Sequence, residues 1–267
     1  DNPSVRYLTL KELLGKKDED PEVLKAKKEI MEKGVVPKIL SKQALDGGFL
    51  DKKVYKKFKK DRKEWIDLGY LPKYKGTIWQ VILMAELEAN PKDSRIKKLC
   101  DYVIKRMFIG REVSEVECFG KERTFPCFVS NIVYALSKLG YSNDSMVKNS
   151  IDWLIKYQRF DDGDFKTPNE LPYRGSKDRC FGKHSCYTGC IKALKVITLI
   201  PEKERTSEIK GFISKGAEFF LTHRVFKSSK NPSVSITKWI EKLSSWFANT
   251  DFLEILLTLT ELRIDDE

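Results

Sequence analysis

A chain of 267 residues with 41% hydrophobic and 11% aromatic residues can bury a substantial core, as one large domain or two small ones. Its formal net charge is +11, but lysines are spread along the whole chain and alternate with Glu and Asp, which argues against a nucleic-acid-binding protein. A basic surface beside an anionic small-molecule group, such as a diphosphate, is equally compatible with this charge.

Three features favour a cytoplasmic location. The first seventeen residues lack a basic stretch followed by an apolar one, so we expect no signal peptide. The longest apolar stretches, such as 78–87, are too short and interrupted to span a bilayer, although contact with a membrane surface stays open. Six cysteines in a long, charged chain are not typical of a secreted disulfide framework, so we expect reduced thiols or bound metal.

The first part of the chain predicts a polar, extended segment over residues 1–20, with a short amphipathic piece at 9–14. A helix is expected to begin at Pro21 and to end before Gly34, because Pro favours the first helical turn and Gly the position after the last. Further helical segments are predicted at 35–45 and at 51–68.

The rest of the chain contains a repeated helical hairpin. Each copy has an apolar helix, a turn, and an amphipathic helix that ends in an acid, an aromatic residue and two apolar residues. The predicted apolar helices span 78–87, 128–139, 189–200 and 252–262, and the amphipathic helices span 95–105, 146–156 and 208–222.

The two kinds of helix predict two layers. A helix that is apolar nearly all round should be buried, whereas an amphipathic helix exposes its charged face. Inner helices ringed by outer helices satisfy both conditions, and an open solenoid is the competing arrangement. Neither end of the repeat looks like a polar cap, which favours closure. The sequence therefore predicts a single all-α domain, an α/α toroid, over residues 1–267.

This pattern resembles the α/α-toroid superfamily of protein prenyltransferase β subunits and squalene/terpene cyclases. Gln43-x3-Gly47-x-Phe49 is similar to that superfamily's Gln-x3-Gly-x-Trp turn, with Phe in place of Trp, and Gln158-x4-Gly163-x-Phe165 is a looser copy. Several short segments also resemble a prokaryotic group of prenyltransferase/squalene-cyclase-repeat proteins. They are 4–7, 75–80, 126–128, 183–186 and 250–255. The resemblance implies an isoprenoid or other apolar ligand in a central cavity.

Two motifs of the family are altered in this chain. Class II cyclases protonate an alkene with Asp-x-Asp-Asp, which Asp161-Asp-Gly-Asp164 does not match, so we interpret this tract as a polar loop. Protein prenyltransferase β subunits hold zinc with an Asp-x-Cys pair and a later His. Asp178-Arg-Cys180 resembles the pair and His184 the later His, but they lie four residues apart instead of a repeat apart.

The densest chemistry lies in residues 178–195, which hold three of the six cysteines and one of the two histidines. With a cysteine from the preceding repeat, these residues could form a tetrahedral zinc site. An iron–sulfur cluster would need four thiolates and is less favoured. Buried free cysteines and a disulfide are the alternatives. The candidate metal ligands are Cys118, Cys127, Asp178, Cys180, His184 and Cys186.

Two residues are candidates for catalysis. His184 could be a metal ligand, a general acid/base or a structural histidine, whereas His223 is expected to interact with the C-terminus of its own helix. Asp251 could cap the last helix or face a cavity as a general acid.

The candidate substrate-binding residues have two interpretations. Their aromatic side chains either pack in the core or line an isoprenoid cavity, where π faces stabilise a carbocation. Cationic side chains could meet a diphosphate. The candidates are Trp79, Phe128, Asn131, Tyr187, Trp246, Arg179 and Lys183.

The first functional hypothesis is a terpene-cyclase- or prenyltransferase-like enzyme, in which a metal at the Cys/His cluster acts as a Lewis acid or activates a nucleophile. The second is a non-catalytic toroid that binds a lipid or a partner protein. The third is a zinc-dependent cyclase acting on peptide thiols. No oligomeric state is predicted.

Overall fold

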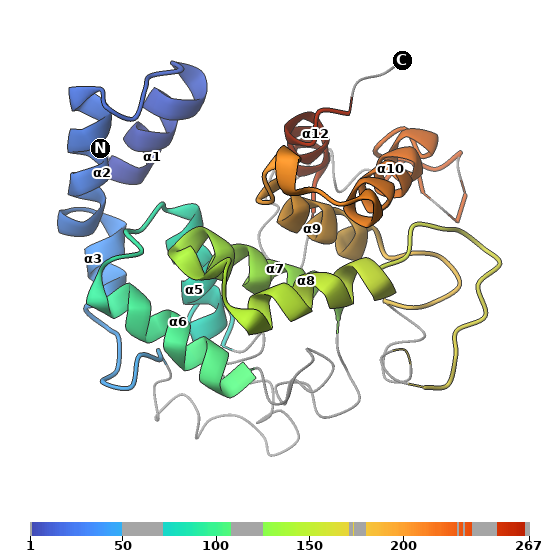
Figure 1. The fold of residues 1–267 in the computed structure, drawn as a ribbon, viewed down its shortest axis with the longest axis horizontal. Coiled ribbons are helices and arrows are strands. Elements are labelled where there is room, and N and C mark those ends of the chain that lie inside the picture. The colour runs from blue at the N-terminus through green and yellow to red at the C-terminus, as the bar shows by residue number, and fades with distance from the viewer. Residues whose placement is uncertain are drawn as a thin grey trace. The chain divides into compact units, whose positions relative to one another are not determined.

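The computed structural model describes residues 2–49, 72–107, 125–170, 173, 180–228, 230–231, 233–236 and 250–264. Over these ranges the chain is helical, and the only strand-like pairing is a single bridge between Lys227 and Ser235 (Figure 1). The all-α class predicted from the sequence is therefore confirmed for the described residues.

The helices fall close to the predicted positions. The α-helices are α1 (Pro3–Leu8), α2 (Pro21–Glu32), α3 (Val35–Leu40), α5 (Thr77–Glu86), α6 (Ser94–Met107), α7 (Pro126–Leu136), α8 (Ser145–Tyr157), α9 (Tyr187–Thr198), α10 (Ser207–Thr222) and α12 (Phe252–Glu261). Short π-helical turns follow at η1 (Thr9–Leu13) and η5 (Ser137–Tyr141), and η6 (Glu202–Glu204) is a 3₁₀ turn. The segment 51–68, for which a helix was expected, lies outside the described residues.

The chain packs as two compact units, each made of two separate stretches. The first comprises Asp1–Ile109 and Ala135–Asn143, and the second comprises Gly110–Tyr134 and Asp144–Glu267. The single toroid domain expected from the sequence stays a prediction.

The N-terminal segment of the first unit is helical, where an extended chain was expected. Asn2 caps α1 by accepting a hydrogen bond from the backbone N–H of Ser4 (3.1 Å), and Pro3 occupies the first turn. Tyr7 and Leu10 are buried, and α1 packs on α2. Burial of this small apolar face, which the polar composition conceals, explains the helix.

The turn at 43–49 joins the beginnings of α5 and α6. The Gln43 amide donates to the carbonyl oxygens of Gly47 and Arg95, both at 2.9 Å. The backbone N–H of Phe49 donates to the Thr77 hydroxyl at 2.8 Å. The Gln-x3-Gly-x-Phe motif therefore acts as a connector that satisfies backbone groups of two neighbouring helices.

The second unit contains α8, α9, α10, α12 and most of α7. Helix α9 packs against both α10 and α12, the three adjacent helices at the orange-to-red end of the chain in Figure 1. Between α9 and α12 lies a buried ion pair, with Lys192 Nζ 2.6 Å from Glu254 Oε1 and side chains only 3% and 5% exposed. The Thr250 hydroxyl donates to the other Glu254 oxygen at 2.9 Å.

The predicted contrast between apolar and amphipathic helices is clear in α5 and α9, which are buried over most of their length. Helix α12 differs from the expectation of burial all round. One side, including Ile255 and Leu259, is buried, but Leu253, Leu256 and Leu257 are 44%, 43% and 55% exposed.

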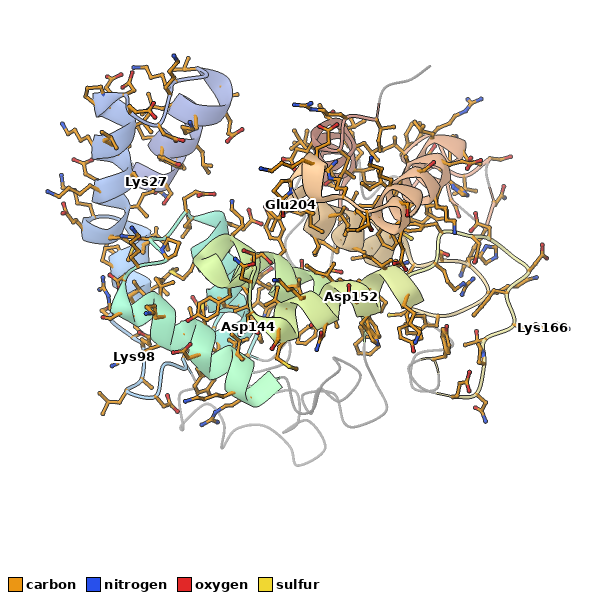
Figure 2. The ribbon with its side chains drawn as sticks, viewed as in Figure 1. Lys27, Lys98, Asp144, Asp152, Lys166 and Glu204 are labelled. Carbon is orange, nitrogen blue, oxygen red and sulfur yellow. The ribbon has the colours of Figure 1, made fainter. Side chains whose placement is uncertain are left out.

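Charged side chains are distributed over the outer faces of the helices and loops. Lys27 on α2, Lys98 on α6 and Lys166 in a loop all project away from the ribbon (Figure 2). Among the described residues, no helix is both long and apolar enough to cross a membrane.

Candidate thiol centre

Three cysteines from two separate parts of the second unit meet at one point. Cys127 lies in the first turn of α7, Cys180 lies in the turn that precedes α9, and Cys186 is the N-cap residue of α9. The Cys180 thiol is in hydrogen-bonding contact with both Cys127 and Cys186. The described cysteines form no disulfide.

The environment of Cys186 favours its thiolate. A hydrogen bond from Cys180 lowers the pKa of Cys186 most, burial opposes this effect, and the backbone N–H groups of Gly189 and Thr188 lower it further. The resulting pKa is about 6, against an ordinary value of 9.0. Contacts with Cys127 and Cys186, followed by burial, instead raise the pKa of Cys180. Cys180 therefore stays a thiol donor while Cys186 carries the charge.

The remaining described cysteines are packing residues. Cys100 and Cys190 are both completely buried. Burial raises the pKa of Cys100 to about 12 and that of Cys190 well above its ordinary value. The Cys190 thiol lies 3.3 Å from the carbonyl oxygen of Arg159.

The segment between Cys180 and Cys186 is tied to residues 159–167 along its whole length. The Thr167 hydroxyl donates to the Phe181 carbonyl oxygen at 2.5 Å, and the Arg159 guanidinium donates to the Gly182 carbonyl oxygen at 2.8 Å. The Gly163 N–H donates to the Lys183 carbonyl oxygen at 3.1 Å. These bonds give the cysteine-bearing segment, residues 180–186, a fixed path.

The acidic tract, Asp161-Asp-Gly-Asp164, forms the other contacts of the cysteine-bearing segment. Ser185 is held twice, because its N–H donates to the Asp161 carbonyl oxygen (3.0 Å) and its hydroxyl accepts from the Asp161 N–H (2.9 Å). Arg159 forms a two-pronged ion pair with the Asp161 carboxylate and stacks on the Phe165 ring. The tract interpreted as a polar loop is thus the support of the thiol centre.

Asp162 bridges both histidines of the chain. Its carboxylate oxygens lie 3.4 Å from Nδ1 of His184 and 2.8 Å from Nε2 of His223. Nδ1 of His223 lies 2.6 Å from the Phe219 carbonyl oxygen in the last turn of α10. The expected interaction of His223 with the C-terminus of its helix is confirmed.

Asp251 is an N-cap residue. It is 4% exposed, and its carboxylate accepts a hydrogen bond from the Glu254 N–H at 2.9 Å. This geometry matches the capping alternative. A catalytic role for Asp251 stays a prediction.

The candidate substrate-binding residues that the structure describes are mostly packed. Phe128 and Asn131 on α7 are 1% and 8% exposed, and Trp79, in the first unit, is 6% exposed and contacts Tyr74 edge-on. The Tyr187 ring packs against those of Phe219, Phe220 and His223, its hydroxyl donates to the Lys227 carbonyl oxygen, and burial raises its pKa. Lys183 is exposed.

Four candidate residues lie outside the described ranges, namely Cys118, Asp178, Arg179 and Trp246. Within those ranges, no group of three or more His, Cys, Asp or Glu residues already has the arrangement of a metal site. The three thiols are in contact, but they do not yet have the arrangement of a metal-binding site.

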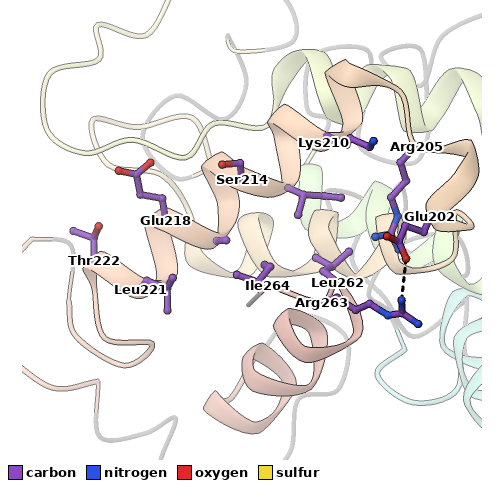
Figure 3. Close-up of a pocket in the computed structure, with 12 residues that line it drawn as sticks. Glu202, Arg205, Lys210, Ser214, Glu218, Leu221, Thr222, Leu262, Arg263 and Ile264 are labelled. Atoms are coloured by element: carbon purple, nitrogen blue, oxygen red, sulfur yellow. Dashed lines mark hydrogen bonds and ion pairs between the residues drawn. The ribbon is translucent and has the colours of Figure 1, made fainter. Parts of the chain in front are cut away.

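A groove of about 610 Å³ lies elsewhere in the second unit, between α10 and the chain that follows α12 (Figure 3). Ile213, Ala217 and Leu262 form part of its apolar lining, and an ion pair of Arg263 with Glu202 (3.1 Å) closes one end. None of the candidate substrate-binding residues lines this groove.

Comparisons of the chain with models of protein families, with curated proteins and with solved structures find no match. The toroid architecture and the family resemblance stay predictions.

Proposed function

We propose that the second unit is a metal-binding unit that holds a zinc ion through the thiolates of Cys127, Cys180 and Cys186. One observation carries the proposal: Cys180 contacts the other two sulfurs, although Cys127 lies on a different helix, more than fifty residues before the segment that carries Cys180 and Cys186. Two thiols in contact are common in a packed helical protein, but three thiols in contact are a typical donor set for zinc.

The distances required by zinc are compatible with this contact. A Zn–S bond of about 2.3 Å in a tetrahedral site separates two sulfurs by about 3.8 Å. That separation is close to the sulfur–sulfur distance of an S–H···S contact, so small movements would bring the thiols onto an ion. Zinc would replace the thiol protons through which Cys180 now bonds its neighbours.

The environment of Cys186 also fits a metal ligand. Its lowered pKa means that this sulfur has already lost its proton near neutral pH. The N–H groups of Thr188 and Gly189 would continue to donate to the sulfur after it bound zinc, as outer-shell hydrogen bonds do in known zinc sites.

A fourth ligand completes a tetrahedron, and the chain offers three candidates. His184 has its Nδ1 on Asp162, the arrangement in which a carboxylate orients an imidazole and leaves Nε2 for a metal. Cys118 and Asp178 are the other two, and both lie outside the described residues. A site that keeps this position open to substrate would supply a Lewis acid or an activated nucleophile.

The substrate class rests on the resemblance alone. An enzyme of the terpene-cyclase or prenyltransferase type, acting on an isoprenoid, is the first expectation. A zinc-dependent cyclase acting on peptide thiols is an alternative with the same metal, and a lipid- or protein-binding toroid would use the zinc for structure.

The metal content of protein purified without chelator tests the proposal. We expect about one equivalent of zinc in the wild type and less than about 0.2 in Cys180→Ala, because that sulfur contacts the other two. Cys100→Ala is the matched control, since Cys100 is buried and is not part of the thiol cluster. Substitution with Co²⁺ should give thiolate-to-metal absorption that Cys180→Ala lacks. Wild-type protein without zinc or iron, and without Co²⁺ absorption, would contradict the proposal.

A further inference from the structure

We propose that Asp162 is a positioning residue for the thiol centre, a role that rests on the proposed zinc function. Its carboxylate holds His184, which lies two residues before Cys186 in the cysteine-bearing segment. The same carboxylate holds His223 at the end of α10. Asp162 thereby anchors the segment that carries two of the three thiols to a long helix of the same unit.

The cysteine-bearing segment has no regular structure, so the Asp162 contacts add to the backbone hydrogen bonds that fix its path. Only five residues separate Cys180 from Cys186, and the first four of them lie in turns and bends before α9 begins. Four of the five, other than His184, are tied to residues 159–167 by hydrogen bonds that involve their backbone groups or the Ser185 hydroxyl. His184 is tied to the same tract by its side chain, through Asp162.

The second anchor explains why a carboxylate occupies this position. A carboxylate has two oxygens that both accept, so it can serve one imidazole on each side. The Asp162–His223 contact at 2.8 Å is the shorter of the two, and His223 is itself fixed to the Phe219 carbonyl oxygen. Both His223 ring nitrogens are therefore engaged, and its side chain is only 8% exposed. His223 is therefore the more rigidly held of the two histidines.

Neighbouring charges show that Asp162 has a role different from that of the other acids in the tract. The Asp161 carboxylate is neutralised locally by Arg159. Asp164 is exposed. Asp162 alone of the three acids connects the tract to α10.

The consequence is that Asp162 sets how closely Cys180 and Cys186 approach each other. Without the bridge, the segment keeps its backbone hydrogen bonds to residues 159–167 and the packing of Tyr187 on α10, but the His184 side chain loses its tie to His223. A looser pair of sulfurs binds zinc less tightly, as when outer-shell partners of known metal ligands are removed.

Asp162→Asn tests the inference. An amide has one accepting oxygen, so it can serve one imidazole and must turn N–H groups toward the other. We expect zinc affinity, measured by competition with a chromophoric chelator, to fall about ten- to a hundredfold. We also expect a shift of the Co²⁺ absorption bands, which a purely structural loss elsewhere would leave unchanged. Asp164→Asn makes the same change of charge two residues away and should leave both measurements unaltered.

A measurement without metal separates this inference from the zinc proposal. Phenylarsine oxide bridges two neighbouring thiols, so its rate of capture by metal-free protein reports the approach of Cys180 and Cys186. We expect Asp162→Asn to react several times more slowly than the wild type and Asp164→Asn to react at the wild-type rate. If the wild type holds no zinc but this difference is present, the zinc proposal fails and the positioning role stands.

The inference would be overturned if Asp162→Asn reacted with phenylarsine oxide at the wild-type rate. It would also be overturned if Asp162→Asn kept the zinc affinity and the Co²⁺ bands of the wild type. Should Asp162→Asn not fold, His223→Gln tests the same bridge from α10. That variant retains the His184 contact and is expected to show the same slower capture and weaker zinc binding in a smaller degree.

Discussion

At the scale of single residues, Cys186 shows how local structure creates reactivity. The first N–H groups of a helix have no partner within the helix, and those of Thr188 and Gly189 in α9 are directed at the sulfur. The Cys180 thiol adds a third donor. These interactions together outweigh burial, which by itself would hold the proton on the sulfur, as it does at Cys100.

The alkylation rate of metal-free protein should follow this pKa. Because the thiolate is the nucleophile, the reaction of Cys186 with iodoacetamide should be near its maximum at pH 8 and fall as the pH falls through about 6. Cys100, with a pKa raised to about 12, should stay unmodified in folded protein over that range. Cys180→Ala removes the largest cause of the shift and should move the midpoint upward. Peptide mapping after timed alkylation measures each site, and a Cys186 midpoint near 9 would contradict the assignment.

The supporting residues of the thiol centre were not predicted. Asp161 and Asp162 were interpreted as part of a polar loop and Arg159 was given no role, because their partners lie about twenty or more residues further along the chain. One signal was present in the sequence. Gly163 has a φ of +90°, a conformation suited to glycine, and it belongs to the looser copy of the Gln-Gly-Phe motif. That motif could have indicated a structured turn.

At the scale of elements, the turn at 43–49 explains why the motif has its residues. Gly47 has a φ of +99°, and a Cβ atom built there would lie 2.3 Å from the Lys98 carbonyl oxygen. A side chain at this position would therefore meet both backbone strain and a collision with α6. Gln43 can bond the start of α6 only because the chain approaches it so closely.

Replacement of Gly47 by Ala should destabilise the first unit markedly. We expect the free energy of unfolding to fall by about 3 kcal/mol or more, combining strain at positive φ with the displacement of backbone. Gly15→Ala is the control, because Gly15 also has a positive φ, +58°, but has no atom within 4 Å of the Cβ position. The free energy of unfolding of that variant should fall by only about 1 kcal/mol. Urea unfolding of both variants measures the difference, and equal losses would show that the approach to Lys98 does not matter.

The helices themselves were predictable to within a few residues. Repetition of an apolar and an amphipathic pattern located α5 to α10 and α12, since each pattern depends only on which side of the helix meets the core. The N-terminal helix α1 was missed because its apolar face is short. The exposed leucines of α12 were not anticipated, because helical periodicity cannot tell how many neighbours cover a helix.

At the scale of the whole molecule, the division into two units limits where metal binding can act. All three thiols belong to the second unit, whereas the turn at 43–49 and helices α1 to α3 belong to the first. Zinc that binds only the folded second unit stabilises that unit by mass action, by about 2.7 kcal/mol when free zinc is a hundredfold above its Kd.

Hydrogen exchange with and without zinc should reveal this division. We expect slower exchange of backbone amides in residues 158–170 and 180–190 when zinc is added to metal-free protein, because their hydrogen bonds then open less often. Amides of α1, α2 and α3 should exchange at unchanged rates. Mass spectrometry of peptic peptides resolves the two regions. Uniform protection of both units would show instead that they unfold together.

The sequence by itself determined the helical class, the positions of most helices and the cysteines with candidate ligand chemistry. These properties follow from local pattern: periodicity, caps and residue type. Only the tertiary structure decided that Cys127, Cys180 and Cys186 meet, that Asp162 joins both histidines, and that Tyr187 packs in an aromatic cluster. Such contacts join residues far apart in the chain, and their formation depends on how the helices pack, which no local pattern specifies.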